Sequence, residues 1–127
     1  DADDNYTVTT VIDGGGENRQ TGTQEYTLTV AAKQYGSGNA YYYNGIQQQG
    51  FSFQRGGTYI FNHPAAHPLR FSTTSDGTHN GGSAYVDAVS VNSSTQIQIT
   101  VDDNTPSTLY YYCSIHPGMG ARIDIVT

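Results

Sequence analysis

Three side chains that bind soft metal ions lie close together near the C-terminal end of the sequence. Cys113, His116 and Met119 form a Cys-x-x-His-x-x-Met motif, and Pro117 and Gly118 close it into a tight loop. A thiolate, an imidazole and a thioether form a donor set that suits a transition metal of soft or borderline character. The motif therefore predicts a metal site at the end of the tyrosine-rich segment that precedes it.

Two further imidazoles lie upstream, in the segment Phe-Asn-His-Pro-Ala-Ala-His-Pro-Leu-Arg-Phe that contains His63 and His67. One thiolate and two imidazoles with a weak axial thioether are the ligand set of a type 1 copper centre. Zinc normally takes four good ligands, or three and a water, and a thioether is a poor ligand for it. The residues therefore favour copper, with either His63 or His67 as the second imidazole.

The elements that must position these groups are predicted to be strands. Apolar and polar residues alternate with a period of two, as in Tyr26 to Val30 and Ile97 to Val101, and turn-forming clusters separate the alternating runs. Among these clusters, Asn44-Gly45 predicts a tight hairpin turn. No segment carries a persuasive helical stripe. Short strands at this spacing predict an all-β sandwich or small barrel. We expect strands near residues 6–12, 25–32, 40–43, 51–54, 57–63, 69–73, 86–91, 95–101, 107–113 and 121–126.

Strand parity predicts where the thiol lies. Cys113 shares a strand face with Leu109 and Tyr111, which should point into the core. Its thiolate should therefore be buried at one end of the sandwich. It is the only cysteine, so an internal disulfide is excluded.

Length and charge narrow the classes of function. A chain of 127 residues predicts one domain, and its net charge of −6 disfavours binding to nucleic acid or to anionic membrane surfaces. No apolar run approaches the roughly 18 residues that a membrane span needs. Residues 13–24 are polar and glycine-rich, so we expect an extension or extra strand at 1–24 and a core domain at 25–127. The shortage of lysine predicts an exported protein, periplasmic or extracellular.

The C-terminal motif resembles that of the cupredoxins, the small blue copper proteins that include plastocyanin, pseudoazurin and amicyanin. The Tyr-Tyr-Tyr-Cys-Ser-Ile-His-Pro-Gly-Met segment is similar to the family's aromatic strand and ligand loop, with the short spacing seen in amicyanin. His67, followed by Arg70 and Phe71, resembles the strand of the first ligand. The resemblance covers about 25–127. It implies a Greek-key β-sandwich that carries single electrons, with copper held by His67, Cys113, His116 and Met119.

The chain also departs from the family pattern. Pro68 stands where an asparagine often ties the two ligand segments together, so the hydrogen bonds around the ligands must differ. The glycine-rich segment 74–94 and the extension 1–24 have no match in a small plastocyanin. We expect His79, within that segment, to be solvated and not a ligand, and His63 to be a surface or strand-end residue.

The resemblance leaves more than one function open. The first is electron transfer with an unidentified protein redox partner, by a monomer that is not an enzyme. The second is a structural or binding module of a surface or virion assembly, with copper structural or absent, because the segments around His67 and Cys113 are also similar to cupredoxin-like modules of marine microbes and phages. A third is copper storage or delivery.

Hydrolytic or nucleophilic chemistry has weaker support in the sequence. A Cys–His nucleophile pair would be only three residues apart, without a clear third group to orient it. The sequence has neither a Gly-x-Ser-x-Gly elbow nor a glycine-rich phosphate loop.

Overall fold

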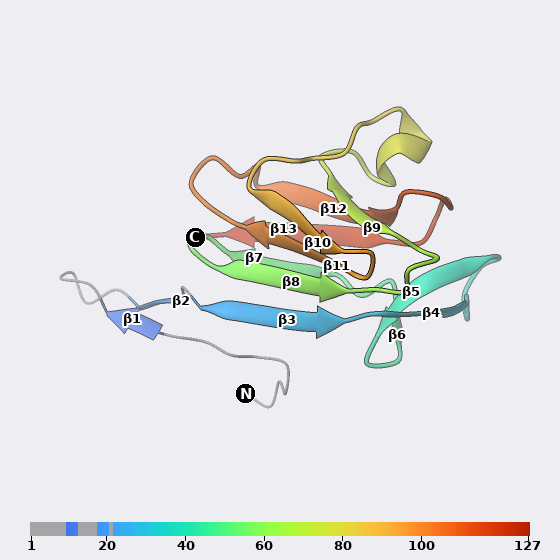
Figure 1. Cartoon of the computed structure of the whole chain (residues 1–127), viewed down its shortest axis with the longest axis horizontal. Coiled ribbons are helices and arrows are strands. Elements are labelled where there is room, and N and C mark those ends of the chain that lie inside the picture. The colour runs from blue at the N-terminus through green and yellow to red at the C-terminus, as the bar shows by residue number, and fades with distance from the viewer. Residues whose placement is uncertain (1–9, 13–17, 21) are drawn as a thin grey trace.

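Two four-stranded sheets face each other in the computed structural model, which describes residues 10–12, 18–20 and 22–127 (Figure 1). In spatial order, the first sheet consists of β10 (Val89–Ser93), β11 (Gln96–Thr100), β8 (Thr58–Asn62) and β3 (Thr23–Thr27). The second consists of β7 (Phe51–Gln54), β13 (Ala121–Val126), β12 (Thr108–Cys113) and β9 (Leu69–Ser72). A smaller sheet consists of β4 (Thr29–Ala32), β5 (Asn39–Tyr43) and β6 (Ile46–Gln47).

The core forms where the alternating apolar residues of both sheets meet. Phe61 of β8 and Phe53 of β7 are fully buried, and the Phe53 ring stacks on Tyr59 with centroids 3.9 Å apart. Removing this apolar surface from water is the main force that holds the sheets together. Leu109, Tyr111 and Cys113 belong to the same buried cluster, as their shared strand face predicted.

The chain passes repeatedly from one sheet to the other. β8 lies between β3 and β11, and β12 lies between β9 and β13, so strands far apart in sequence become neighbours. Two of the pairings, β3 with β8 and β7 with β13, are parallel. The all-β sandwich predicted from the sequence is confirmed, and the crossings between sheets agree with the Greek-key arrangement.

One predicted strand is divided in the structure. The run 25–32 forms β3 and β4, and Leu28 separates them. Leu28 is buried and its N–H donates to the carbonyl oxygen of Asn62, at the end of β8. The alternation continues through the break, so the sequence pattern does not reveal that the chain changes sheets there. The strand predicted near residues 86–91 also begins later in the structure, as β10 (Val89–Ser93).

The hairpin turn at Asn44-Gly45 agrees with prediction. Both residues have positive φ, at 51° and 79°, and they connect β5 to the short β6. Between β9 and β10 the chain forms a 3₁₀ helix, η1 (Gly77–Asn80), which the sequence did not predict. This helix lies above β12 and β9 in Figure 1.

The N-terminal part contains a short hairpin, β1 (Thr10–Ile12) and β2 (Asn18–Gln20). The predicted strand 6–12 therefore lies partly outside the described residues, and the division of the chain into 1–24 and 25–127 stays a prediction. Within the described residues, no helix has the length and apolar character needed to cross a bilayer.

Candidate metal centre

The pairing of β9 with β12 brings the first predicted ligand to the thiol. Cys113, the last residue of β12, lies opposite Leu69, and the next N–H, that of Ser114, donates to the carbonyl oxygen of Pro68 at 2.9 Å. His67 precedes Pro68 and therefore reaches the end of β12. This backbone hydrogen bond links the two ligand segments at Pro68, a residue whose side chain cannot form such a link.

The loop between β12 and β13 supplies the other two predicted ligands. His116 lies at its exposed part, and Met119, near its end, is fully buried in the same core cluster as Cys113. The carbonyl oxygen of Met119 accepts a hydrogen bond from the N–H of Tyr41 at 3.0 Å. The loop thus places an imidazole at the surface and a thioether in the core.

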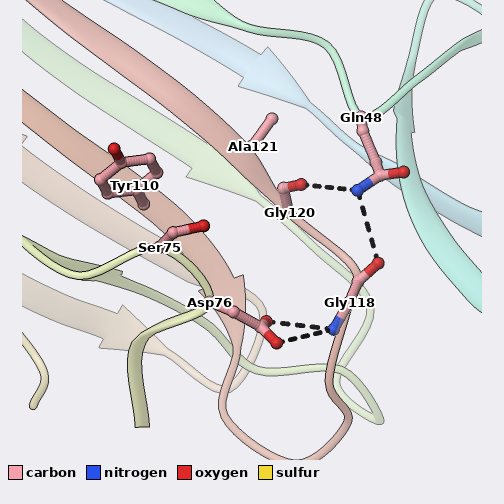
Figure 2. A pocket seen from close by; sticks show the side chains of 7 residues that line it. All are labelled: Gln48, Ser75, Asp76, Tyr110, Gly118, Gly120 and Ala121. Atoms are coloured by element: carbon pink, nitrogen blue, oxygen red, sulfur yellow. Dashed lines mark hydrogen bonds between the residues drawn. The ribbon is translucent and has the colours of Figure 1, made fainter. Parts of the chain in front are cut away.

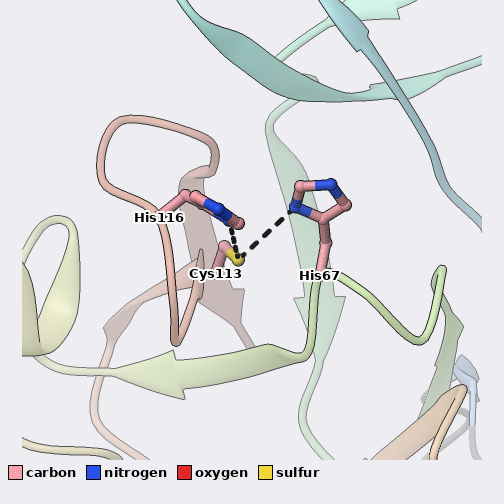
Figure 3. Close-up of side chains that lie close together, drawn as sticks. All are labelled: His67, Cys113 and His116. Atoms are coloured by element: carbon pink, nitrogen blue, oxygen red, sulfur yellow. Dashed lines mark hydrogen bonds between the residues drawn. The ribbon is translucent and has the colours of Figure 1, made fainter.

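Both imidazoles turn a ring nitrogen toward the same sulfur atom (Figure 3). Nδ1 of His67 lies 3.9 Å from Sγ of Cys113, and Nδ1 of His116 lies 3.8 Å from it. The three donor atoms are all within 4.8 Å of one another. Metal bonds of about 2.0–2.3 Å in a trigonal plane separate donor atoms by about 3.5–4.0 Å. The spacing therefore fits a metal ion at the centre of the group.

The donors differ in exposure to solvent. Cys113 is fully buried, His67 is half-buried and His116 is exposed. Burial lowers the pKa of His67, and the neighbouring His116 lowers it further. A neutral imidazole is the form that binds metal. The centre is therefore closed on the thiol side and open to solvent at His116.

His63 takes no part in this group. Its side chain is only 5% exposed, and its Nδ1 lies 2.9 Å from the carbonyl oxygen of Pro64, to which it donates. Its Nε2 is buried without a hydrogen-bond partner among the described residues. The structure thus brings His67 and not His63 to Cys113. His63 directly follows β8, in agreement with the expectation of a strand-end residue, but its ring is buried, so the alternative of a surface position is wrong.

Tyr41 is a residue of the centre that sequence reasoning missed. It is fully buried on β5, and its hydroxyl donates to the carbonyl oxygen of His67 at 2.6 Å. Its own N–H binds Met119, so a single residue connects both ligand segments. Burial raises the pKa of Tyr41, and nearby Cys113 raises it further, which keeps the hydroxyl protonated as a donor. The Tyr41-Tyr42-Tyr43 triplet was the only signal for it in the sequence.

His79 is exposed, as predicted, but it is not merely solvated. Its Nε2 lies 2.7 Å from the carbonyl oxygen of Cys113, and its ring packs edge-on against Tyr112. The imidazole donates to that carbonyl, so it contacts the backbone of the predicted thiolate ligand without offering a donor atom to the metal. No sequence pattern predicted that the glycine-rich segment would contact Cys113.

The group as a whole is a possible metal-binding site of one sulfur and two nitrogen donors, with a methionine nearby. Such a set suits a metal ion that tolerates soft ligands. The same atoms would also form a Cys–His pair, but the second imidazole directed at the sulfur is a donor that such a pair does not require.

Comparisons with known proteins add no family to this description. A scan against protein-family models finds no match, and a search of the curated proteins finds none either. The function is therefore inferred from the residues and their geometry.

Proposed function

We propose that the protein binds one copper ion at His67, Cys113 and His116, with Met119 as a weak axial ligand, and that it transfers single electrons. The observation that carries this proposal is the convergence of two imidazole nitrogens on one buried sulfur from segments 46 residues apart. The resemblance of the ligand segments to the cupredoxins supports it. We also propose that the chain belongs to that family and is not an enzyme.

The side chains around the proposed copper site suit electron transfer. When bound, copper would supply the Cu(I)/Cu(II) couple. Cys113 is shielded from water by the core, and its sulfur offers the soft ligand and the shortest covalent route into β12. The exposed ring of His116 is the natural place for an electron to enter or leave. Hydrogen bonds from Tyr41 to both ligand segments restrain the donors, so that little rearrangement accompanies a change of oxidation state.

Partner and location are inferred from composition and exposure. The apolar side chain of Ile115, which is 57% exposed, lies beside His116 and provides contact area for a protein redox partner. The polar, lysine-poor chain is in keeping with a periplasmic or extracellular protein. A virion-associated location belongs to the structural alternative.

Copper titration tests the proposal. Cu(II) is added to the metal-free full chain while the visible spectrum is recorded. We expect one equivalent to produce an intense thiolate-to-copper band and reversible one-electron voltammetry. A colourless product would contradict a type 1 centre, and a coloured but redox-inert product would favour the structural module.

Three variants test the ligand set. Cys113→Ala should abolish the band, because no other thiol is present. His67→Ala should bleach it, whereas His63→Ala should retain it. The opposite result for the two histidines would show that His63 is the ligand.

A further inference from the structure

Most of the loop that carries His116 is exposed to solvent. Ser114, Ile115, His116 and Pro117 are all exposed, and only the end of the loop at Met119 enters the core. A loop of this kind needs contacts from elsewhere in the fold if its imidazole is to stay in place. The contacts come from two sides, and one of them is the segment around η1.

Asp76, the residue before η1, reaches the loop directly (Figure 2). Its two carboxylate oxygens accept the N–H of Gly118 at 3.0 and 3.1 Å. Hydrogen bonds to a charged acceptor are roughly twice as strong as neutral ones. Gly118 lies directly before Met119 and two residues after His116, so the bond holds the loop between its two predicted ligands.

Gln48 holds the same stretch from the opposite side. Its Nε2 donates to the carbonyl oxygen of Gly120 at 2.9 Å and lies 3.4 Å from that of Gly118 (Figure 2). Gly118 has a φ of +75°, in the left-handed region that glycine adopts readily. Asp76 and Gln48 thus bind opposite sides of one turn: Asp76 accepts the N–H of Gly118, and Gln48 donates to the carbonyl oxygens of Gly118 and Gly120.

The η1 segment is itself fixed to β12, so Asp76 has a firm base. Gly77 is buried against the Tyr112 ring so closely that an added Cβ would lie 2.5 Å from two of its carbons. His79 binds the carbonyl oxygen of Cys113 at 2.7 Å. The segment therefore spans from the last residues of β12 to the ligand loop.

We propose that Asp76 is a positioning residue of the copper centre, which fixes the His116–Met119 loop through the Gly118 N–H. This inference rests on the proposed function. It gives a role to segment 74–94, which has no match in a small plastocyanin. This segment places Asp76 in contact with the ligand loop and His79 in contact with the ligand strand.

The test compares copper-loaded wild type with Asp76→Ala and a control from the same segment. Asn80→Ala is the control, because the Asn80 side chain is exposed and, among the residues that the structure describes, donates only to the carbonyl oxygen of Ser75. We measure the position of the thiolate-to-copper band and the rate at which a chelator removes Cu(II). Asp76→Ala should shift the band and speed copper loss about tenfold, the size of effect that removing a ligand's hydrogen-bond partner produces. Asn80→Ala should match wild type.

Asp76→Asn keeps the test decisive if the alanine variant fails to fold. Asparagine tolerates the left-handed backbone at this position, where φ is 62°, and retains one acceptor oxygen. Copper loss should then lie between that of wild type and about tenfold faster. Equal band positions and equal rates in Asp76→Asn and Asn80→Ala would overturn the inference while leaving a coloured wild type intact. A wild type that binds no copper would instead refute the proposed function.

Discussion

Tyr41, which contacts both ligand segments, belongs to a tyrosine triplet whose burial the strand pattern does not predict. The triplet Tyr41-Tyr42-Tyr43 is buried throughout, although a strand with a period of two would send the middle ring outward. Tyr42 remains buried because its hydroxyl donates to the carbonyl oxygen of Ala32 at 2.8 Å, across the β4–β5 pair. The two neighbours therefore make similar bonds to different parts of the fold.

Replacing each hydroxyl separates the effect on the centre from the effect on folding. Tyr41→Phe should lower the free energy of unfolding of the metal-free protein by about 1 kcal/mol, because it loses the bond to His67. Tyr42→Phe should lower it by at least as much, because the Tyr42 hydroxyl donates to Ala32 and also accepts the N–H of Gln34. Only Tyr41→Phe should shift the thiolate-to-copper band, since only its hydroxyl binds the His67 segment. Urea denaturation and visible spectra measure the two effects. An identical spectral response in the two variants would show that Tyr41 does not position the ligand.

At the scale of elements, the approach of the ligand loop to β12 depends on Gly120. A Cβ at this position would overlap the carbonyl oxygen of Tyr111 and lie 2.6 Å from its carbonyl carbon. Both are backbone atoms and cannot rotate away. The absent side chain is what lets β13 begin directly beside β12, with Met119 held in the core.

Gly120→Ala should therefore be severely destabilising. We expect a loss of about 3 kcal/mol in the free energy of unfolding, at the upper end of overpacking effects, because two strands must separate. Gly50→Ala is the control, since among the described residues its Cβ would come within 4 Å of the carbonyl oxygen of Arg122 alone, at 3.4 Å. Its change should stay within about 0.5 kcal/mol. Comparable midpoints in urea for the two variants would rule out this close approach.

The sequence predicts these elements well where local pattern decides them. Alternation places Leu109, Tyr111 and Cys113 on one buried face, and the Asn44-Gly45 turn forms as expected. Alternation cannot show that the chain leaves one sheet for another at Leu28, because the apolar pattern is the same on both sides of the break.

The metal-ligand motif is likewise local, but its supports are not. The residues that brace the loop come from separate parts of the fold, and Asp76 lies 42 residues from Gly118. Such pairs depend on the path of the chain through both sheets, which no spacing in the sequence reports. In the sequence, Pro68 indicates only that a side-chain hydrogen bond between the two ligand segments is absent. In the structure, the Ser114 N–H donates to the carbonyl oxygen of Pro68 and links the two segments instead.

At the scale of the whole molecule, stability of the metal-free protein should depend on pH through His63. Burial lowers the pKa of His63 below its ordinary value of 6.5, and Arg70 lowers it further, although the bond to Pro64 opposes them. The unfolded chain therefore takes up this proton first as pH falls, so the folded state loses stability below about 6.5 and keeps it above.

Substituting His63 should weaken that dependence. His63→Asn retains a donor for Pro64 and removes the titrating group. Between about pH 7.5 and 5, its free energy of unfolding should fall less steeply than that of wild type. An unchanged slope in His63→Asn would mean that His63 titrates alike in the folded and unfolded chains.

A crystal structure of the full chain grown with one equivalent of copper would show the ligands of the ion. We predict a single copper ion bonded to Sγ of Cys113 and to Nδ1 of both His67 and His116, with the Met119 sulfur beside it. Copper bound at His63 or His79 instead, or no copper beside Cys113, would contradict it.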